Sequence, residues 1–297
     1  MRNSPIYTGS QIAITTSSGI HGPIIGEWVI MTSLIASHKY SILHEWQSTR
    51  TWDDSPGGKA RFASVSENVS KRLGILGYGS IGRQVARSAK AMGMEIFAFT
   101  ANPRNTAESR RDHGYVVPGT GDPKGEIPCA WFSGLAKESL HEFLAQDLDH
   151  LLISVPLTQQ TKHLLGKEEF RILSKKNAFV TNIARGEIIV QEDLIEALKQ
   201  FKESGATSDG IWSGLRGAAM DVATPEPLPK DHPLWDAPNC IITPHMSGIN
   251  RDYAARALQV LEKNLQRLAE GQRLLNLVDR QTGYASKVAW IIVIHGW

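Results

Sequence analysis

The chain has 297 residues, enough for one large domain or two of modest size. With 41% hydrophobic residues and a net charge of +2, it has an ordinary globular composition, which argues against a strongly basic nucleic-acid binder. No apolar run approaches the roughly 20 residues of a membrane span, and the start lacks a secretory signal. Two distant cysteines, Cys129 and Cys240, fit a reducing compartment and not a metal spacing. We therefore expect a cytoplasmic protein that binds no nucleic acid, membrane or metal.

The first predicted element is a helix over residues 23–40, which has a proline at its first turn. Apolar residues, among them Trp28 and Met31, recur there at helical spacing and form a wide stripe. A stripe of this width is typical of a helix that packs on the core or on another subunit. Residues 41–70 follow as a predicted polar connection.

The next predicted unit is a strand near 73–77, a helix over 80–92 and a strand over 94–100. The turn before this helix carries three glycines in G-x-G-x-x-G spacing, Gly77, Gly79 and Gly82. The first permits a tight turn, the second lets the backbone approach a pyrophosphate, and the third lets helix and strand pack closely. The free N–H groups of the helix then favour phosphate. Glycine turns also arise for structural reasons alone, but this context predicts a dinucleotide site.

Residues 101–135 are rich in Pro, Gly, Asp and Arg, which predicts a long surface loop. Beyond it, apolar strands are predicted at 150–155, 177–183, 215–222 and 239–243, and helices at 167–173, 191–202 and 250–270. Strands that are apolar throughout and alternate with helices predict an α/β fold with a Rossmann-type, doubly wound parallel sheet. An apolar run at 290–294 predicts either a buried edge strand or an aggregation-prone extension.

Three reactive side chains follow predicted strands, at the sheet edge that also carries the glycine turn: Arg185, Glu226 and His245. The planar fork of Arg185 can hold a carboxylate through two hydrogen bonds. His245 can exchange a proton near neutral pH, and a nearby Glu226 would favour its imidazolium form. The set suits hydride transfer to a 2-oxo acid. Taken singly, each also has an ordinary explanation: Arg185 could cap a strand, Glu226 could simply face solvent, and His245 is one of ten histidines.

Five motifs together resemble the D-isomer-specific 2-hydroxyacid dehydrogenases, and in particular the glyoxylate and hydroxypyruvate reductases. They are the glycine turn, Val155 to Thr158, Asn182 to Gly186, Asp221-Val222 followed by Glu226-Pro227, and Thr243 to His245. The resemblance runs from about Gly19 to Asp279. It implies an NAD(P)-dependent oxidoreductase that acts on a small 2-hydroxy or 2-oxo acid, with Arg185, Glu226 and His245 as the catalytic set. It also implies a homodimer that is formed partly through the helix over 23–40.

The cofactor contacts that the turn and the resemblance together imply are Gly77, Gly79, Ser80, Ile81, Gly82, Pro156, Ile183 and Asp221. Of these, Ser80 and Ile81 would touch the pyrophosphate, and Asp221 would lie by the nicotinamide. NAD enzymes carry an acid at the end of the second strand, but residues 99–104 contain none. Thr100, Asn102 and Arg104 could instead hold a 2′-phosphate, which favours NADP(H) over NAD(H). The alternative is that Arg104 belongs only to a loop.

The resemblance also implies how the chain is divided. We expect a remnant of the substrate domain at 1–22, a dinucleotide-binding domain at 23–246, a return helix of the substrate domain at 247–279 and an atypical tail at 280–297. The resemblance implies a front half of the substrate domain that we expect to be missing here, so the closed, water-excluding site would be incomplete. A catalytically impaired dinucleotide-binding fragment, or an interaction or sensor protein, is therefore the alternative function.

Overall fold

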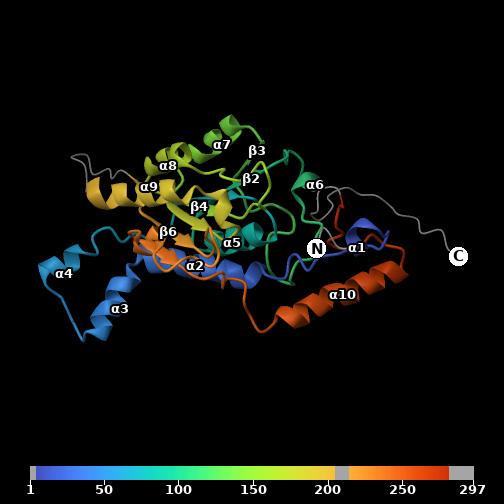
Figure 1. The fold of residues 1–297 in the computed structure, drawn as a ribbon, viewed down its shortest axis with the longest axis horizontal. Helices are drawn as coiled ribbons and strands as arrows, with labels where there is room; N and C mark the ends of the chain where they lie inside the picture. Colours follow the sequence, from blue (N-terminus) through green and yellow to red (C-terminus); the bar gives the residue numbers. More distant parts are fainter. Residues whose placement is uncertain (1–4, 205–213, 281–297) are drawn as a thin grey trace.

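The computed structural model describes residues 5–204 and 214–280, and its centre is one parallel sheet of seven strands (Figure 1). The strands are β1 (Arg72–Leu76), β2 (Glu95–Thr100), β3 (Ala130–Ser133), β4 (His150–Ile153), β5 (Phe179–Asn182), β6 (Gly217–Met220) and β7 (Cys240–Ile242). Their spatial order is β3-β2-β1-β4-β5-β6-β7. The order reverses between β1 and β4, which is where open α/β sheets form their ligand crevice. The apolar run at 290–294 lies outside the described residues.

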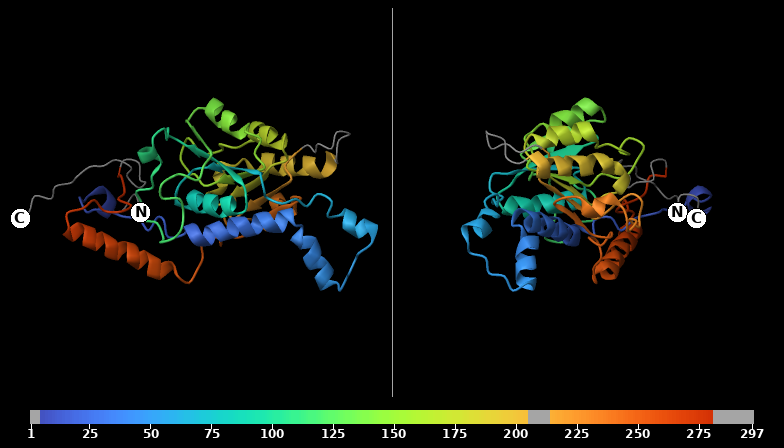
Figure 2. Two further views of the ribbon diagram at one scale, coloured as in Figure 1. Left: turned by 180° about the vertical axis from the view of Figure 1, so that it is seen from behind. Right: turned by 60° about the vertical axis from the view of Figure 1, so that its left-hand side comes forward.

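Helices cover both faces of the sheet, which confirms the predicted α/β, doubly wound Rossmann-type fold (Figures 1 and 2). The helices are α1 (Pro5–Thr8), α2 (Gly22–Ser37), α3 (Tyr40–Ser48), α4 (Pro56–Ala60), α5 (Ser80–Ala91), α6 (Ala107–Arg110), α7 (Lys137–Leu144), α8 (Lys167–Ser174), α9 (Gln191–Ser204) and α10 (Tyr253–Ala269), with 3₁₀ turns η1 (Gly186–Ile188) and η2 (Pro233–Asp236). Helices α7, α8 and α9 pack on one face, and α2 and α5 on the other. None of the helices in the described ranges is long and apolar enough to cross a bilayer.

The central strands are mostly apolar because successive side chains enter two different cores. In β4, Leu151 and Ile153 pack with α7, α8 and α9, whereas Leu152 between them packs with α2 and α5. All three side chains are fully buried. This two-sided burial fixes the register of the sheet and therefore the positions of the loops at its edges.

Two of the predicted connections are wrong. The segment 101–135 is not all surface loop, because it ends in edge strand β3, which pairs with β2, and because Tyr115 is only 3% exposed. The segment 41–70 contains α3 and α4. The residues of α3 are all at least partly exposed. The sequence carries only a short apolar group there, Ile42, Leu43 and Trp46.

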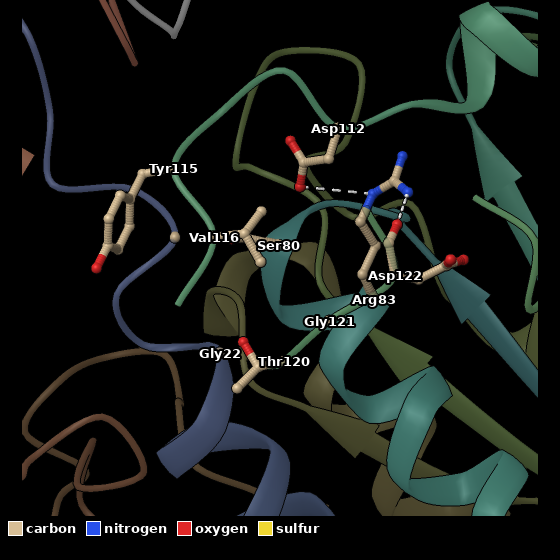
Figure 3. Close-up of a pocket in the computed structure, with 10 residues that line it drawn as sticks. Gly22, Ser80, Arg83, Asp112, Tyr115, Val116, Thr120, Gly121 and Asp122 are labelled. Carbon is tan, nitrogen blue, oxygen red and sulfur yellow. Dashed lines mark hydrogen bonds and ion pairs between the residues drawn. The ribbon is translucent and has the colours of Figure 1, made fainter. Parts of the chain in front are cut away.

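The middle of the segment 101–135 is fastened to α5 by the buried guanidinium of Arg83 (Figure 3). Arg83 Nε lies 3.6 Å from Asp112 Oδ2, and its Nη1 donates to the carbonyl of Asp122 at 2.5 Å. The carboxylate of Asp122 accepts from the Tyr78 hydroxyl, at 2.8 Å, inside the glycine turn. The segment is therefore tied both to the turn and to the helix that follows it.

Candidate functional site

The loops at the carboxyl edge of the sheet carry the candidate site. The glycine turn follows β1, Pro156 follows β4, Arg185 follows β5, Glu226 follows β6 and His245 follows β7. Since β1, β4, β5, β6 and β7 are successive neighbours, these loops line one edge of the sheet in that order. The sheet thus brings together side chains from five separate stretches of sequence.

His245 and Glu226 form a pair. Nδ1 of His245 lies 3.1 Å from Oε2 of Glu226, and both side chains reach solvent. The other carboxylate oxygen, Oε1, accepts from the backbone N–H of Ala223 at 3.0 Å. Partial burial acts to raise the pKa of Glu226, but these hydrogen bonds and the nearby charges of His245 and Arg185 outweigh it and hold that pKa below its usual value. Glu226 is therefore a carboxylate that can orient the imidazole at neutral pH.

His245 is held in an unusual backbone conformation. Its φ is +56°, which a non-glycine residue adopts only where surrounding contacts enforce it. Its N–H donates to the carbonyls of Asp221, at 2.8 Å, and Thr243, at 3.0 Å. The tight turn directs the imidazole back toward the loop of Glu226.

The carboxylate of Asp221 anchors this turn. Asp221 is 1% exposed, and its oxygens accept from the Thr243 hydroxyl at 2.6 Å, the Met246 N–H at 2.8 Å and both the N–H and the hydroxyl of Ser247. A buried carboxylate with this many donors is well compensated. The family resemblance places Asp221 by the nicotinamide, but the sequence carries no signal for this anchoring role.

Arg185 lies on the neighbouring loop and is exposed. Asn182, the last residue of β5, shapes this loop, because its side-chain amide donates to the carbonyl of Arg185 at 2.9 Å and its Oδ1 accepts from the Ala184 N–H at 3.0 Å. One guanidinium nitrogen of Arg185 donates to the carbonyl of Ala184 at 2.5 Å. The charge of Arg185 also contributes to the lowered pKa of Glu226.

The glycine turn has the shape of a phosphate cradle. Gly77 has φ of +99°, and a Cβ there would lie 2.8 Å from the backbone of Ser154. A Cβ on Gly82 would lie 2.7 Å from the carbonyl oxygen of Gly77. Gly79 is different, because it is exposed and open space surrounds the position of its missing Cβ. Its open side adjoins the first turn of α5, so the residues present fit the pyrophosphate of a dinucleotide.

The remaining sequence-predicted contacts lie at the start of α5, and at or after the ends of β2, β4 and β5. Ser80 starts α5 and lines a small pocket together with residues of the Arg83-bound segment (Figure 3). Thr100 ends β2, and its hydroxyl donates to the carbonyl of Asn102 at 2.7 Å. Arg104 is half-buried, and one of its guanidinium nitrogens donates to the carbonyl of Ser109. Ile81 is partly buried, Pro156 is exposed and Ile183 is 8% exposed.

Comparison with known proteins identifies the family. The sequence model of the "D-isomer specific 2-hydroxyacid dehydrogenase, NAD binding domain" matches residues 30–118 and 128–247. The chain belongs to the D-isomer-specific 2-hydroxyacid dehydrogenase family. This membership confirms the predicted resemblance, and the family consists of NAD(P)-dependent oxidoreductases.

Individual relatives differ in the substrates for which they are named. The D-3-phosphoglycerate dehydrogenase of Methanocaldococcus jannaschii is 31% identical over 234 residues, which are 78% of this chain and 37% of the relative. The hydroxypyruvate reductase of Blautia hydrogenotrophica is 29% identical over 82% of this chain and 62% of the relative. The chain therefore spans less than two thirds of the length of these relatives. A solved family member from Aeromonas salmonicida superposes with a TM-score of 0.67 at 27% identity, covering 93% of this chain and 75% of that one.

Proposed function

We propose that this protein transfers a hydride between a nicotinamide cofactor and a small 2-hydroxy or 2-oxo acid, such as glyoxylate or hydroxypyruvate. The observation that carries the proposal is the His245–Glu226 pair, which lies on the sheet edge shared with Arg185 and the glycine cradle. An imidazole, a carboxylate that orients it and a guanidinium are the groups needed to reduce a carbonyl beside a carboxylate.

Each residue has a defined task in this proposal. Arg185 binds the substrate carboxylate through its fork and polarises the adjacent carbonyl. His245 donates a proton to the carbonyl oxygen during reduction and accepts it back during oxidation. Glu226 keeps the imidazole oriented and stabilises its protonated form. When it is bound, the nicotinamide cofactor supplies or accepts the hydride.

We propose NADP(H) as the preferred cofactor and the glycine turn, with Ser80 and Ile81, as its pyrophosphate site. The support is the absence of an acid among residues 99–104 and the arginine at position 104. The 2′-phosphate site would consist of Thr100, Asn102 and Arg104. To bind phosphate, Arg104 would use the guanidinium nitrogens that do not bond to Ser109.

The test is consumption of NADPH and of NADH by the purified chain, with a panel of small and bulky 2-oxo acids as substrates. We expect turnover with a small 2-oxo acid and higher kcat/KM with NADPH. His245→Ala should lower kcat at least 10²-fold and leave cofactor affinity, measured by fluorescence titration, nearly unchanged. The exposed His44→Ala is the matched control and should behave as the wild type.

The outcomes separate the candidate functions. Loss of cofactor binding in His245→Ala would contradict the role given to His245. A folded wild-type chain that binds NADPH but turns over none of the acids would instead support the alternative, a cofactor-binding sensor or an inactive fragment. Equal kcat/KM with NADH would contradict the cofactor preference alone.

A further inference from the structure

A buried glutamine joins two loops of the candidate site. Gln191 is the first residue of α9 and is only 4% exposed. Its Nε2 donates to the backbone carbonyl of Thr224 at 2.5 Å, and its Oε1 accepts from the Thr224 N–H at 2.8 Å. One side chain thus satisfies both backbone groups of a residue in the loop after β6. The amide therefore pairs with the backbone of Thr224 as the backbone of a neighbouring strand would.

A second close contact lies beside this one. Gly186 follows Arg185, and a Cβ added to it would lie 2.1 Å from the carbonyl carbon and oxygen of Ala223. The backbones of the two loops are therefore in direct contact at this point. Gly186 and Gln191 together hold Ala223 and Thr224 against the loop that contains Arg185, and we name this set of contacts the 191–224 clasp.

The clasped residues are the ones that fix Glu226. The N–H of Ala223 donates to Oε1 of Glu226, and Oε2 of Glu226 contacts His245. A shift of Ala223 and Thr224 would move both the carboxylate and its backbone donor. Arg185 stands at the other end of the clasp, one residue before Gly186. The clasp therefore sets the distance between the Arg185 side of the site and the Glu226–His245 side.

We propose that Gln191 is a positioning residue that holds Glu226, and through it His245, in register with Arg185. The inference rests on the proposed function for its effect on catalysis, but its effect on Glu226 is independent of turnover. Because the site must align an acid–base pair with a bound carboxylate, a small loss of alignment lowers kcat more than it lowers affinity for the cofactor.

The experiment compares Gln191→Met, Gln191→Glu and the control Gln200→Met in the full chain. Methionine keeps the length of the side chain but removes both hydrogen bonds. Gln200 lies on the exposed side of the same helix. Two quantities are measured: kcat and KM with NADPH and a 2-oxo acid, and the pKa of the Glu226 carboxyl. The pKa comes from NMR of glutamate labelled with ¹³C, assigned with Glu226→Gln.

For Gln191→Met we expect kcat to fall about 10- to 100-fold with cofactor Kd within twofold of the wild type. The pKa of Glu226 should rise toward its usual value, because its hydrogen bonds to Ala223 and His245 are no longer held in place. Gln191→Glu has a distinct signature. A protonated glutamate again offers one donor and one acceptor, so its kcat relative to wild type should recover as the pH falls.

An unchanged kcat and an unchanged Glu226 titration in folded Gln191→Met would overturn the proposal. So would equal defects in Gln191→Met and Gln200→Met. If the wild type turns over no acid, the proposed function fails, and the Glu226 titration still decides whether the clasp acts on the carboxylate. If Gln191→Met does not fold, the pH dependence of kcat in Gln191→Glu tests the clasp instead. Recovery of kcat at low pH would support the clasp, and a defect that is independent of pH would contradict it.

Discussion

His150 shows how one buried residue can control the pH dependence of the fold. It is 2% exposed in β4, and its Nε2 lies 2.8 Å from the hydroxyl of Thr181. Burial, and then the charge of Arg216, lower the pKa of His150 to about 3. In the unfolded chain the same imidazole titrates near 6.5. As the pH falls, the unfolded state therefore gains the proton first. The contribution of His150 to the free energy of unfolding is fully present above about pH 6.5 and is lost as the pH falls from there toward 3.

We expect His150→Gln, which keeps a hydrogen-bonding side chain but does not titrate, to weaken this dependence. The wild type should lose about 2 kcal/mol more of its unfolding free energy than the variant between pH 7.5 and pH 5.0. Urea unfolding at the two pH values measures the difference. His44→Gln, which changes an exposed histidine, should keep the wild-type slope. Equal slopes in the wild type and in His150→Gln would show that His150 is not the group responsible.

Residues of the site were predictable from sequence to the extent that strand ends determine their positions. Arg185, Glu226 and His245 each follow a predicted strand, and the sequence placed them at one edge of the sheet. The contact between His245 and Glu226 meets the condition under which Glu226 was expected to favour the imidazolium. The donors around Asp221 were not predictable, because they come from a tight turn 22 to 26 residues later in the chain. Gln191 gave no signal either, since glutamine is ordinary in the first turn of a helix.

At the scale of elements, two glycines of the turn between β1 and α5 differ in their surroundings. Gly82 packs against backbone, whereas Gly79 faces open space. Gly82→Ala brings a Cβ to 2.7 Å from a backbone oxygen, so we expect it to destabilise the fold by about 1–3 kcal/mol. Gly79→Ala meets open space and has an allowed φ of −90°, so stability should be unchanged. Its methyl group would nevertheless occupy the approach to the cradle and weaken NADPH binding.

Thermal unfolding and NADPH titration of the two variants measure these effects. Gly79→Ala should retain the wild-type Tm and lose cofactor affinity by at least tenfold, whereas Gly82→Ala should lower Tm. Normal NADPH affinity in Gly79→Ala would mean that the pyrophosphate does not approach this side of the turn. In that case the dinucleotide would have to bind elsewhere on the edge of the sheet.

The buried central strands carry a stronger sequence signal than edge strand β3. Strands β1, β4 and β5 lie in the centre of the sheet and were predicted, because burial on both faces favours a run of mostly apolar residues. Edge strand β3 has only four residues, all partly buried, and it follows a stretch rich in turn-forming residues. Helix α7 is short and follows β3 closely, so it too was missed. The other edge strand, β7, is also only partly buried, but its three residues are all apolar and it was predicted.

At the scale of the whole molecule, α10 lies beside the sheet domain and projects away from it (Figures 1 and 2). Tyr115, from the segment between β2 and β3, connects the two. It is 3% exposed and packs with Val260 of α10, and its hydroxyl lies 3.0 Å from Oε1 of Gln259. Its N–H donates to the side chain of Asn276, in the chain that follows α10. The segment expected to be a surface loop therefore fastens α10 to the nucleotide-binding part.

Tyr115→Ala should separate the stability of α10 from that of the sheet. Removing a buried aromatic ring costs about 3–5 kcal/mol where the surroundings cannot collapse, and here that cost falls on the contact with α10. Because the sheet has its own two cores, the opening should be local. Hydrogen exchange should become at least tenfold faster at Val260 and Asn264, with no change at Ile75 and Leu152.

Tyr40→Ala, on exposed α3, is the control and should leave the exchange rates of all four residues unchanged. Equal acceleration in the sheet would mean that α10 and the sheet unfold as one unit, and that Tyr115 stabilises the whole molecule and not one junction.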